Sequence, residues 1–197
     1  MQSKINAVKS RPKELTTILI ILSWMTYRIL GFIFMPSIEV FGGDVLPTAW
    51  IIPLGQDALI GLTAPIVVYL LATRPKIISY AIGLAWVWWG IADFGVGLVT
   101  EIFQPPFKSP MGENTPSLVL TGWLLTNLAL ELYAFYLLLT PKVRNYFMAS
   151  EKDKPLNLKE TPLSGKWIFA IVAAALTGLF FPIMAMGING FFKMLGY

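Results

Sequence analysis

Residues 77–100 read IISYAIGLAWVWWGIADFGVGLVT, an apolar run that contains a single charged side chain, Asp93. An α-helix needs about 20 apolar residues to cross the ~30 Å hydrocarbon core of a bilayer. A helix also satisfies its own backbone hydrogen bonds, which lipid cannot do for it. This run is therefore predicted to be a membrane-spanning helix.

Four similar runs lie elsewhere in the chain, two before this one and two after it. The predicted spans cover residues of about 15–35, 50–73, 77–100, 117–140 and 167–192, and a polar cytoplasmic loop is predicted at 141–166. None of these runs alternates apolar and polar residues as the strands of a membrane barrel do. The sequence thus predicts one domain, residues 1–197, that is an all-α bundle of five transmembrane helices. A cleaved signal peptide is the alternative for the first run, but Arg28 and the apolar residues after it favour an uncleaved span.

The composition agrees with a membrane protein. Apolar residues make up 56% of the chain and charged residues 13%, whereas soluble domains average about 45–50% and ~25%. The chain has no Cys and no His, which excludes disulfides, thiolate nucleophiles and imidazole chemistry. It also has no phosphate-binding loop, nucleophile elbow or dinucleotide fingerprint. We therefore expect no cofactor, no metal site and no catalytic set of a known type.

The basic residues give an orientation. Twelve of the fifteen Lys and Arg residues lie in the N-terminal tail, in the turn at 74–76 or in the 141–166 loop. Cytoplasmic loops carry such an excess, so we expect a cytoplasmic N-terminus and an external C-terminus in a multi-pass protein of the plasma membrane. This distribution explains the net charge of +4 without nucleic acid. The expected partners are the lipid bilayer and, if the chain belongs to a complex, other membrane subunits.

Charged residues inside the spans are the candidates for function, since each costs about 2.5–3.5 kcal/mol at a helix centre. At 1.5 Å per residue, Arg28 lies ~20 Å and Asp93 ~24 Å from the cytoplasmic ends of their spans. Asp57 lies ~6–10 Å below the outer face. These three residues are predicted to share one layer in the outer half of the membrane, where the fork of Arg28 could bind both carboxylates. The alternative for Asp57 is an acid that complements a helix dipole.

Other residues could support such a site. Trp24 precedes Arg28 by four residues, so its indole could cover one face of the guanidinium. Glu131 lies ~8 Å from the cytoplasmic side, one turn after Asn127, and is predicted to form a separate titratable station or an interhelical hydrogen bond. The tryptophans of the third span, including Trp89, are typical of interfacial belts and core packing, with a pigment pocket as the alternative.

Small residues accompany the acids. Gly61 follows Asp57 by one turn, and Gly90 and Gly97 lie on the same helical face as Asp93. Small side chains let membrane helices approach closely. We therefore expect the helices that carry the two aspartates to pack tightly near them.

These features favour a non-enzymatic membrane protein that binds or helps to move a small solute, ion or proton. Arg28 would be the gating or anion-binding cation, and Asp57 and Asp93 would be its counter-ions. One alternative is an enzyme that acts on a lipid or isoprenoid substrate through carboxylic acids, which would need an apolar groove beside Asp93 or Glu131. The other is a purely structural subunit, which would show a sealed bundle with every charge paired.

Overall fold

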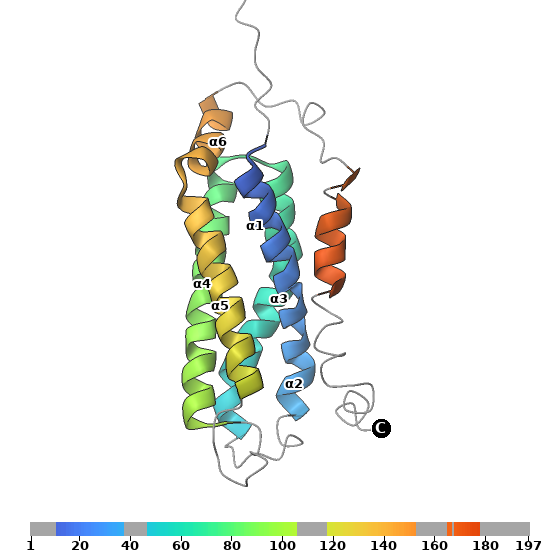
Figure 1. The fold of residues 1–197 in the computed structure, drawn as a ribbon, viewed down its shortest axis with the longest axis vertical. Helices are drawn as coiled ribbons and strands as arrows, with labels where there is room; N and C mark the ends of the chain where they lie inside the picture. The colour runs from blue at the N-terminus through green and yellow to red at the C-terminus, as the bar shows by residue number, and fades with distance from the viewer. Residues whose placement is uncertain (1–10, 38–46, 106–117, 153–164, 167, 178–197) are drawn as a thin grey trace, which may run out of the picture.

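A computed structural model of the chain describes residues 11–37, 47–105, 118–152, 165–166 and 168–177. Within these residues all regular secondary structure is helical. The long helices lie side by side along the long axis of the molecule (Figure 1). The α-helices are α1 (Lys13–Trp24), α2 (Gly31–Ser37), α3 (Ile51–Thr73), α4 (Ile77–Phe103), α5 (Leu118–Leu139) and α6 (Pro141–Lys152), and the 3-10 helices are η1 (Met25–Leu30) and η3 (Pro47–Trp50).

Among the described residues, four helical segments are long and apolar enough to cross a membrane. They are Lys13–Met35, Thr48–Thr73, Ile77–Phe103 and Leu118–Leu139. The first four predicted spans are thereby confirmed as apolar helices of spanning length. Of the fifth predicted span, the structure describes an apolar helix over Ile168–Thr177, and residues 178–192 lie outside the described part.

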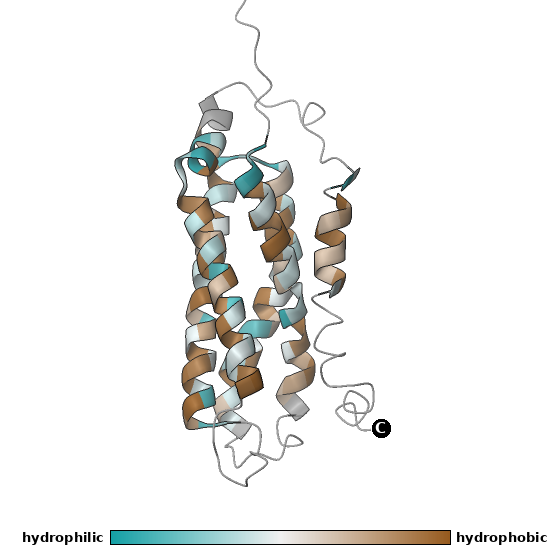
Figure 2. Cartoon of the chain, viewed as in Figure 1, coloured by the Kyte–Doolittle hydropathy of each residue, from teal (hydrophilic) through white to brown (hydrophobic). Residues whose placement is uncertain are grey.

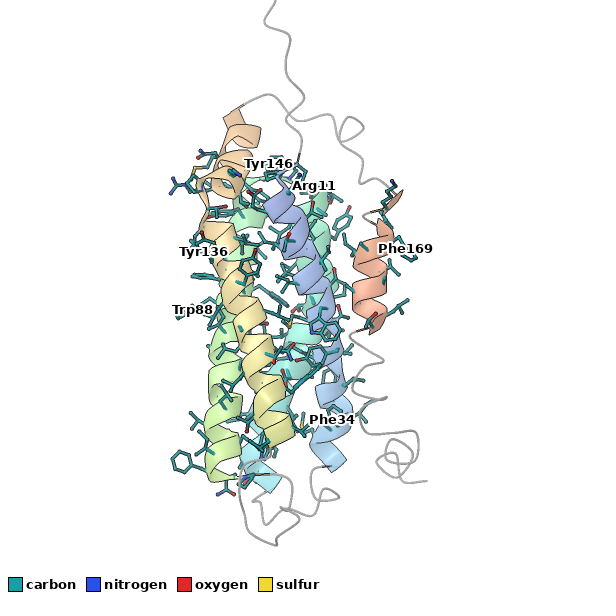
Figure 3. All side chains as sticks on the ribbon, viewed as in Figure 1. Arg11, Phe34, Trp88, Tyr136, Tyr146 and Phe169 are labelled. Atoms are coloured by element: carbon teal, nitrogen blue, oxygen red, sulfur yellow. The ribbon has the colours of Figure 1, made fainter. Side chains whose placement is uncertain are left out.

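Large apolar side chains cover both the inside and the outside of the bundle. The main core lies between α1, α3, α4 and α5. On the outer side, Ile66 is 59% exposed and Trp88 is 60% exposed, and Figure 3 shows Trp88 and Tyr136 projecting from the bundle. Figure 2 shows hydrophobic residues along the long helices and hydrophilic ones near the end that carries α6. An apolar outer surface of this kind suits contact with lipid.

The first span changes its helix type partway along. The 3-10 helix η1 separates α1 from α2, and its backbone touches α3 at Gly61. A Cβ atom at Gly61 would lie 2.0 Å from the backbone nitrogen of Ile29 and 2.6 Å from the carbonyl carbon of Arg28. Tight packing at the predicted small residue is therefore confirmed, and it brings the backbone of Arg28 against α3.

The predicted loop at 141–166 is wrong at its start, because residues 141–152 form α6. The side chains of Val143, Tyr146 and Phe147 are buried, and the Phe147 ring lies 5.5 Å from the Tyr80 ring, centroid to centroid. These buried residues recur at three- and four-residue spacing, which is typical of an amphipathic helix. The polar composition of the segment concealed this pattern. Residues 153–164 of the predicted loop lie outside the described part.

Contacts at the same end of the bundle hold the start of the described chain in place. Arg11 Nη2 donates to the carbonyl oxygen of Ala72 at 2.6 Å. Lys142 Nζ donates to Glu14 Oε1 at 2.8 Å on the surface. This hydrogen bond raises the pKa of Lys142 above its ordinary value, because it stabilises the charged ammonium.

Candidate functional site

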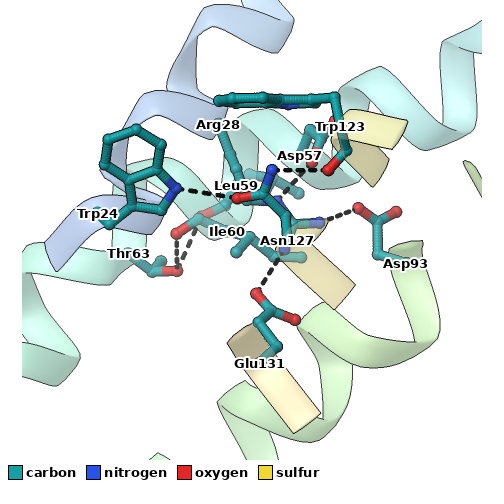
Figure 4. A network of polar contacts seen from close by, with 10 residues as sticks. All are labelled: Trp24, Arg28, Asp57, Leu59, Ile60, Thr63, Asp93, Trp123, Asn127 and Glu131. Atoms are coloured by element: carbon teal, nitrogen blue, oxygen red, sulfur yellow. Dashed lines mark hydrogen bonds and ion pairs between the residues drawn. The ribbon is translucent and has the colours of Figure 1, made fainter. Parts of the chain in front are cut away.

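Arg28 lies at the centre of a polar cluster inside the bundle (Figure 4). Its side chain comes from η1, and the residue is 1% exposed. Arg28 Nε donates to Asp57 Oδ1 of α3 at 2.5 Å, and Nη1 donates to Glu131 Oε1 of α5 at 2.8 Å. The third nitrogen, Nη2, donates to Asp93 Oδ2 of α4. We call these four residues the Arg28 cluster.

Arg28 contacts both Asp57 and Asp93, the two acids that the sequence placed in its layer. The helical period brings the acids inward: Asp93 shares the buried face of α4 with Gly90 and Gly97. The guanidinium fork has donors in several directions, so it can bind carboxylates from three helices at once. The cluster thereby joins the first, second, third and fourth apolar segments.

Glu131 does not form the separate station that the sequence suggested. It is fully buried and binds the same guanidinium as the two aspartates. Residue counts along straight helices give only the heights of Cα atoms, whereas the contact joins the far ends of two long side chains. The depth estimate also took the membrane face to lie near residue 140, where the chain in fact continues almost at once as α6.

Gly90 makes the space that Glu131 occupies. A Cβ atom at Gly90 would lie 2.3 Å from Glu131 Oε2 and 2.4 Å from Oε1. Any larger residue at this position would therefore meet the carboxylate. The expected close packing beside Asp93 is present. The group that packs against Gly90 is the side-chain carboxylate of Glu131.

Aromatic residues enclose the guanidinium in a way that the sequence did not show. The Phe94 ring centroid lies 4.1 Å from Arg28 Cζ, so Phe94 covers the cation. Trp24, which the sequence placed near the guanidinium, donates from Nε1 to Asn127 Oδ1 at 2.9 Å and joins α1 to α5. Trp89 is partly buried and packs against the main core. The sequence signal for Phe94 was its place beside Asp93 in the third span.

A fourth acid, Glu101, is also fully buried. It lies on the buried face of α4, two turns beyond Asp93. The predicted third span ends at residue 100, but α4 continues to Phe103, so Glu101 lies inside the helix. Its burial was therefore missed.

The charges of the Arg28 cluster do not balance. One guanidinium faces three carboxyl groups, so the formal charge is −2 when all of them are ionised. Among the described residues, Asp93 Oδ1 and Glu131 Oε2 are buried and have no hydrogen-bond partner. Two carboxylates 4 Å apart repel by about 4 kcal/mol at an effective dielectric constant of 20. Protonation of one or more of the acids would remove this repulsion.

The three acids differ in their access to the surroundings. The side chain of Asp57 is 26% exposed, that of Asp93 is 3% exposed and that of Glu131 is fully buried. A small species from outside the bundle would therefore meet Asp57 first. The other two acids are buried within the bundle.

Comparison of the chain with known protein families, curated proteins and solved structures finds no match. The function is therefore argued from the Arg28 cluster itself.

Proposed function

We propose that this chain is an integral membrane protein whose Arg28 cluster binds protons within the bilayer and helps to move them across it. The protein acts alone or as a subunit of a larger membrane complex. It has five transmembrane helices, a cytoplasmic N-terminus and an external C-terminus, and it resides in the plasma membrane. One observation supports this function above all: three carboxyl groups from three helices surround one buried guanidinium.

The number of acids argues against a purely structural lock. A single carboxylate beside Arg28 would already leave a neutral pair that holds two helices together. Each further buried carboxylate adds a desolvation penalty and repulsion from the first. An excess of buried acid is costly for stability, but each acid is a group that can take up and release a proton.

The burial of the acids argues against an enzyme that acts on lipid. Such an enzyme would have to bring its substrate against Asp93 or Glu131, which are 3% and 0% exposed. The space beside Glu131 is filled by its own carboxylate packed against Gly90. A proton needs no apolar groove, and the partly exposed Asp57 suffices to admit it.

The orientation is supported by the basic residues at one end of the bundle. Arg11 contacts the end of α3, Arg74 and Lys76 lie in the turn that follows, and Lys142 begins α6 beside Glu14. The positive-inside rule assigns this end to the cytoplasm. The Arg28 cluster then lies between the two membrane faces, where a proton pathway needs a relay.

Proton flux into vesicles tests this function. The protein is reconstituted into liposomes that enclose a pH-sensitive dye, and a pH gradient is imposed together with a potassium diffusion potential. We expect the gradient to collapse faster than in protein-free liposomes, and the Asp93→Asn variant to abolish this gain because the relay loses an acid. Glu14→Gln is the matched control, since it removes an acid outside the cluster. Wild-type flux equal to that of empty liposomes, or undiminished flux in Asp93→Asn, would contradict the proposal.

A further inference from the structure

Two aspartates occupy one edge of the Arg28 guanidinium. Nε and Nη2 lie on the same edge, and a single carboxylate commonly binds such an edge with both of its oxygens. Here Asp57 accepts from Nε and Asp93 accepts from Nη2. Glu131 binds Nη1, the nitrogen outside that edge. Two separate acids thus occupy the edge that a single carboxylate commonly fills.

The carboxyl groups of Asp57 and Asp93 thus lie against neighbouring nitrogens of one guanidinium, where two ionised carboxylates would repel each other. An ionised carboxylate only accepts hydrogen bonds, so a hydrogen bond between two carboxyl groups requires a proton on one of them. Two adjacent acids commonly resolve their repulsion in this way, by sharing one proton.

We infer that Asp57 and Asp93 share one proton beside Arg28, whereas Glu131 stays ionised as the counter-ion of the guanidinium. The inference rests on the proposed function, since it assigns the proton of that function to a particular pair. On uptake, an oxygen of Asp57 gains a proton from hydronium, which leaves as water, and donates this proton in a hydrogen bond to Asp93. The formal charge of the cluster then changes from −2 to −1, and release reverses the step without breaking any other bond.

The exposure of the two side chains indicates which aspartate exchanges the proton with the surroundings. Asp57 is 26% exposed and Asp93 is 3% exposed, so Asp57 exchanges the proton with the surroundings and Asp93 holds it inside the bundle. The buried Asp93 Oδ1 has no partner among the described residues, so it has a free lone pair on the inner side. Asp57 is therefore the access residue and Asp93 the inner residue of the pair.

Infrared spectroscopy of the full chain in lipid tests the pair. A protonated carboxylic acid has a carbonyl stretching band that a carboxylate lacks. We expect wild-type protein to show this band near neutral pH, and we expect it to shift when aspartate carries a heavy carbon isotope in its side-chain carboxyl. The label separates the aspartates from Glu101 and Glu131 without any mutation. The shifted band should disappear in Asp57→Asn, because the new amide can donate to Asp93 and leave it ionised.

Glu131→Gln is the matched control and should keep the aspartate band. A band that ignores the aspartate label and disappears in Glu131→Gln would overturn the pair while leaving proton binding by the cluster intact. No protonated band at any pH at which the protein remains folded would overturn both the pair and the proposed function. A labelled aspartate band without proton flux in liposomes would support the pair and contradict the proposed function.

Discussion

Arg28 neutralises charge for three helices at once, so its removal should be costly. In Arg28→Leu the buried acids keep their desolvation penalty and lose their common cation. We expect the free energy of unfolding to fall by about 3–5 kcal/mol, the usual loss when a buried ion pair is broken. Thermal unfolding in detergent, followed by circular dichroism, measures this loss.

The double variant Arg28→Leu with Asp93→Asn should recover part of that stability, because fewer uncompensated charges remain. Losses that simply add would show that Arg28 and Asp93 do not interact. The double variant also distinguishes a functional role of the cluster from a purely structural one. A stable double variant that lacks proton flux indicates a functional site, whereas a stable one that keeps flux indicates a structural lock.

Gly90 should not tolerate substitution by alanine, because Glu131 packs against it. The added methyl would overlap the Glu131 carboxylate, and overpacking of this kind costs about 1–3 kcal/mol. We expect Gly90→Ala to displace Glu131 from Arg28 and to lower the unfolding temperature in detergent. Gly97→Ala is the matched control on the same buried face, since its nearest atom would be Leu124 Cδ2 at an ordinary 3.6 Å. Equal effects of the two changes would contradict the role of Gly90.

At the level of elements, the 3-10 helix η1 carries Arg28 to its partners. Runs of 3-10 helix longer than three or four residues are uncommon, so η1 needs support from tertiary contacts. Its backbone packs directly on Gly61 of α3. We expect Gly61→Ala to destabilise the protein by about 3 kcal/mol or more, because backbone atoms cannot move aside as a flexible side chain can.

Gly55→Ala serves as the control for Gly61→Ala on the same helix. Its added methyl would lie 3.8 Å from Met35 Cε, so α3 has room for it. Thermal unfolding of both variants in detergent gives the comparison. A Gly61→Ala protein as stable as the Gly55→Ala protein would show that α3 and η1 do not pack as closely as described.

The helix α6 should contribute to stability although its segment is polar overall. Phe147 is fully buried, and truncation of a buried phenylalanine costs about 3–5 kcal/mol. We expect Phe147→Ala to lower the unfolding temperature and to expose α6 to protease in detergent. Met148→Ala, at a side chain that is 40% exposed, should change little. Rapid cleavage within 141–152 in the wild type would contradict the packing of α6.

At the level of the whole molecule, the orientation can be tested because the chain has no native cysteine. Gly42→Cys and Gly112→Cys lie outside the described residues, in predicted external loops, and should react with an impermeant thiol reagent in intact cells. Ser150→Cys, in α6 at the predicted cytoplasmic end, should react only after the membrane is opened. Labelling of Ser150→Cys in intact cells would show that the proposed orientation is wrong.

The helical architecture could be predicted because its signals are local. The length of an apolar run and the charges at its ends are properties of consecutive residues. Four of the runs are indeed long apolar helices. The layer shared by Arg28, Asp57 and Asp93 also followed from residue counts along straight helices, and their contacts are present.

The remaining partners of Arg28 depend on how the helices are rotated and how far their long side chains extend. Counting residues placed Glu131 in the other half of the membrane and could not show that Gly90 leaves room for its carboxylate. Nor could it show that Phe94 covers the guanidinium. Apolar runs are encoded in neighbouring residues, so the sequence alone predicted the apolar helices of spanning length and a layer of charge within them. The surplus of acid around Arg28 arises from residues up to 103 positions apart, so it became visible only when the helices were packed together.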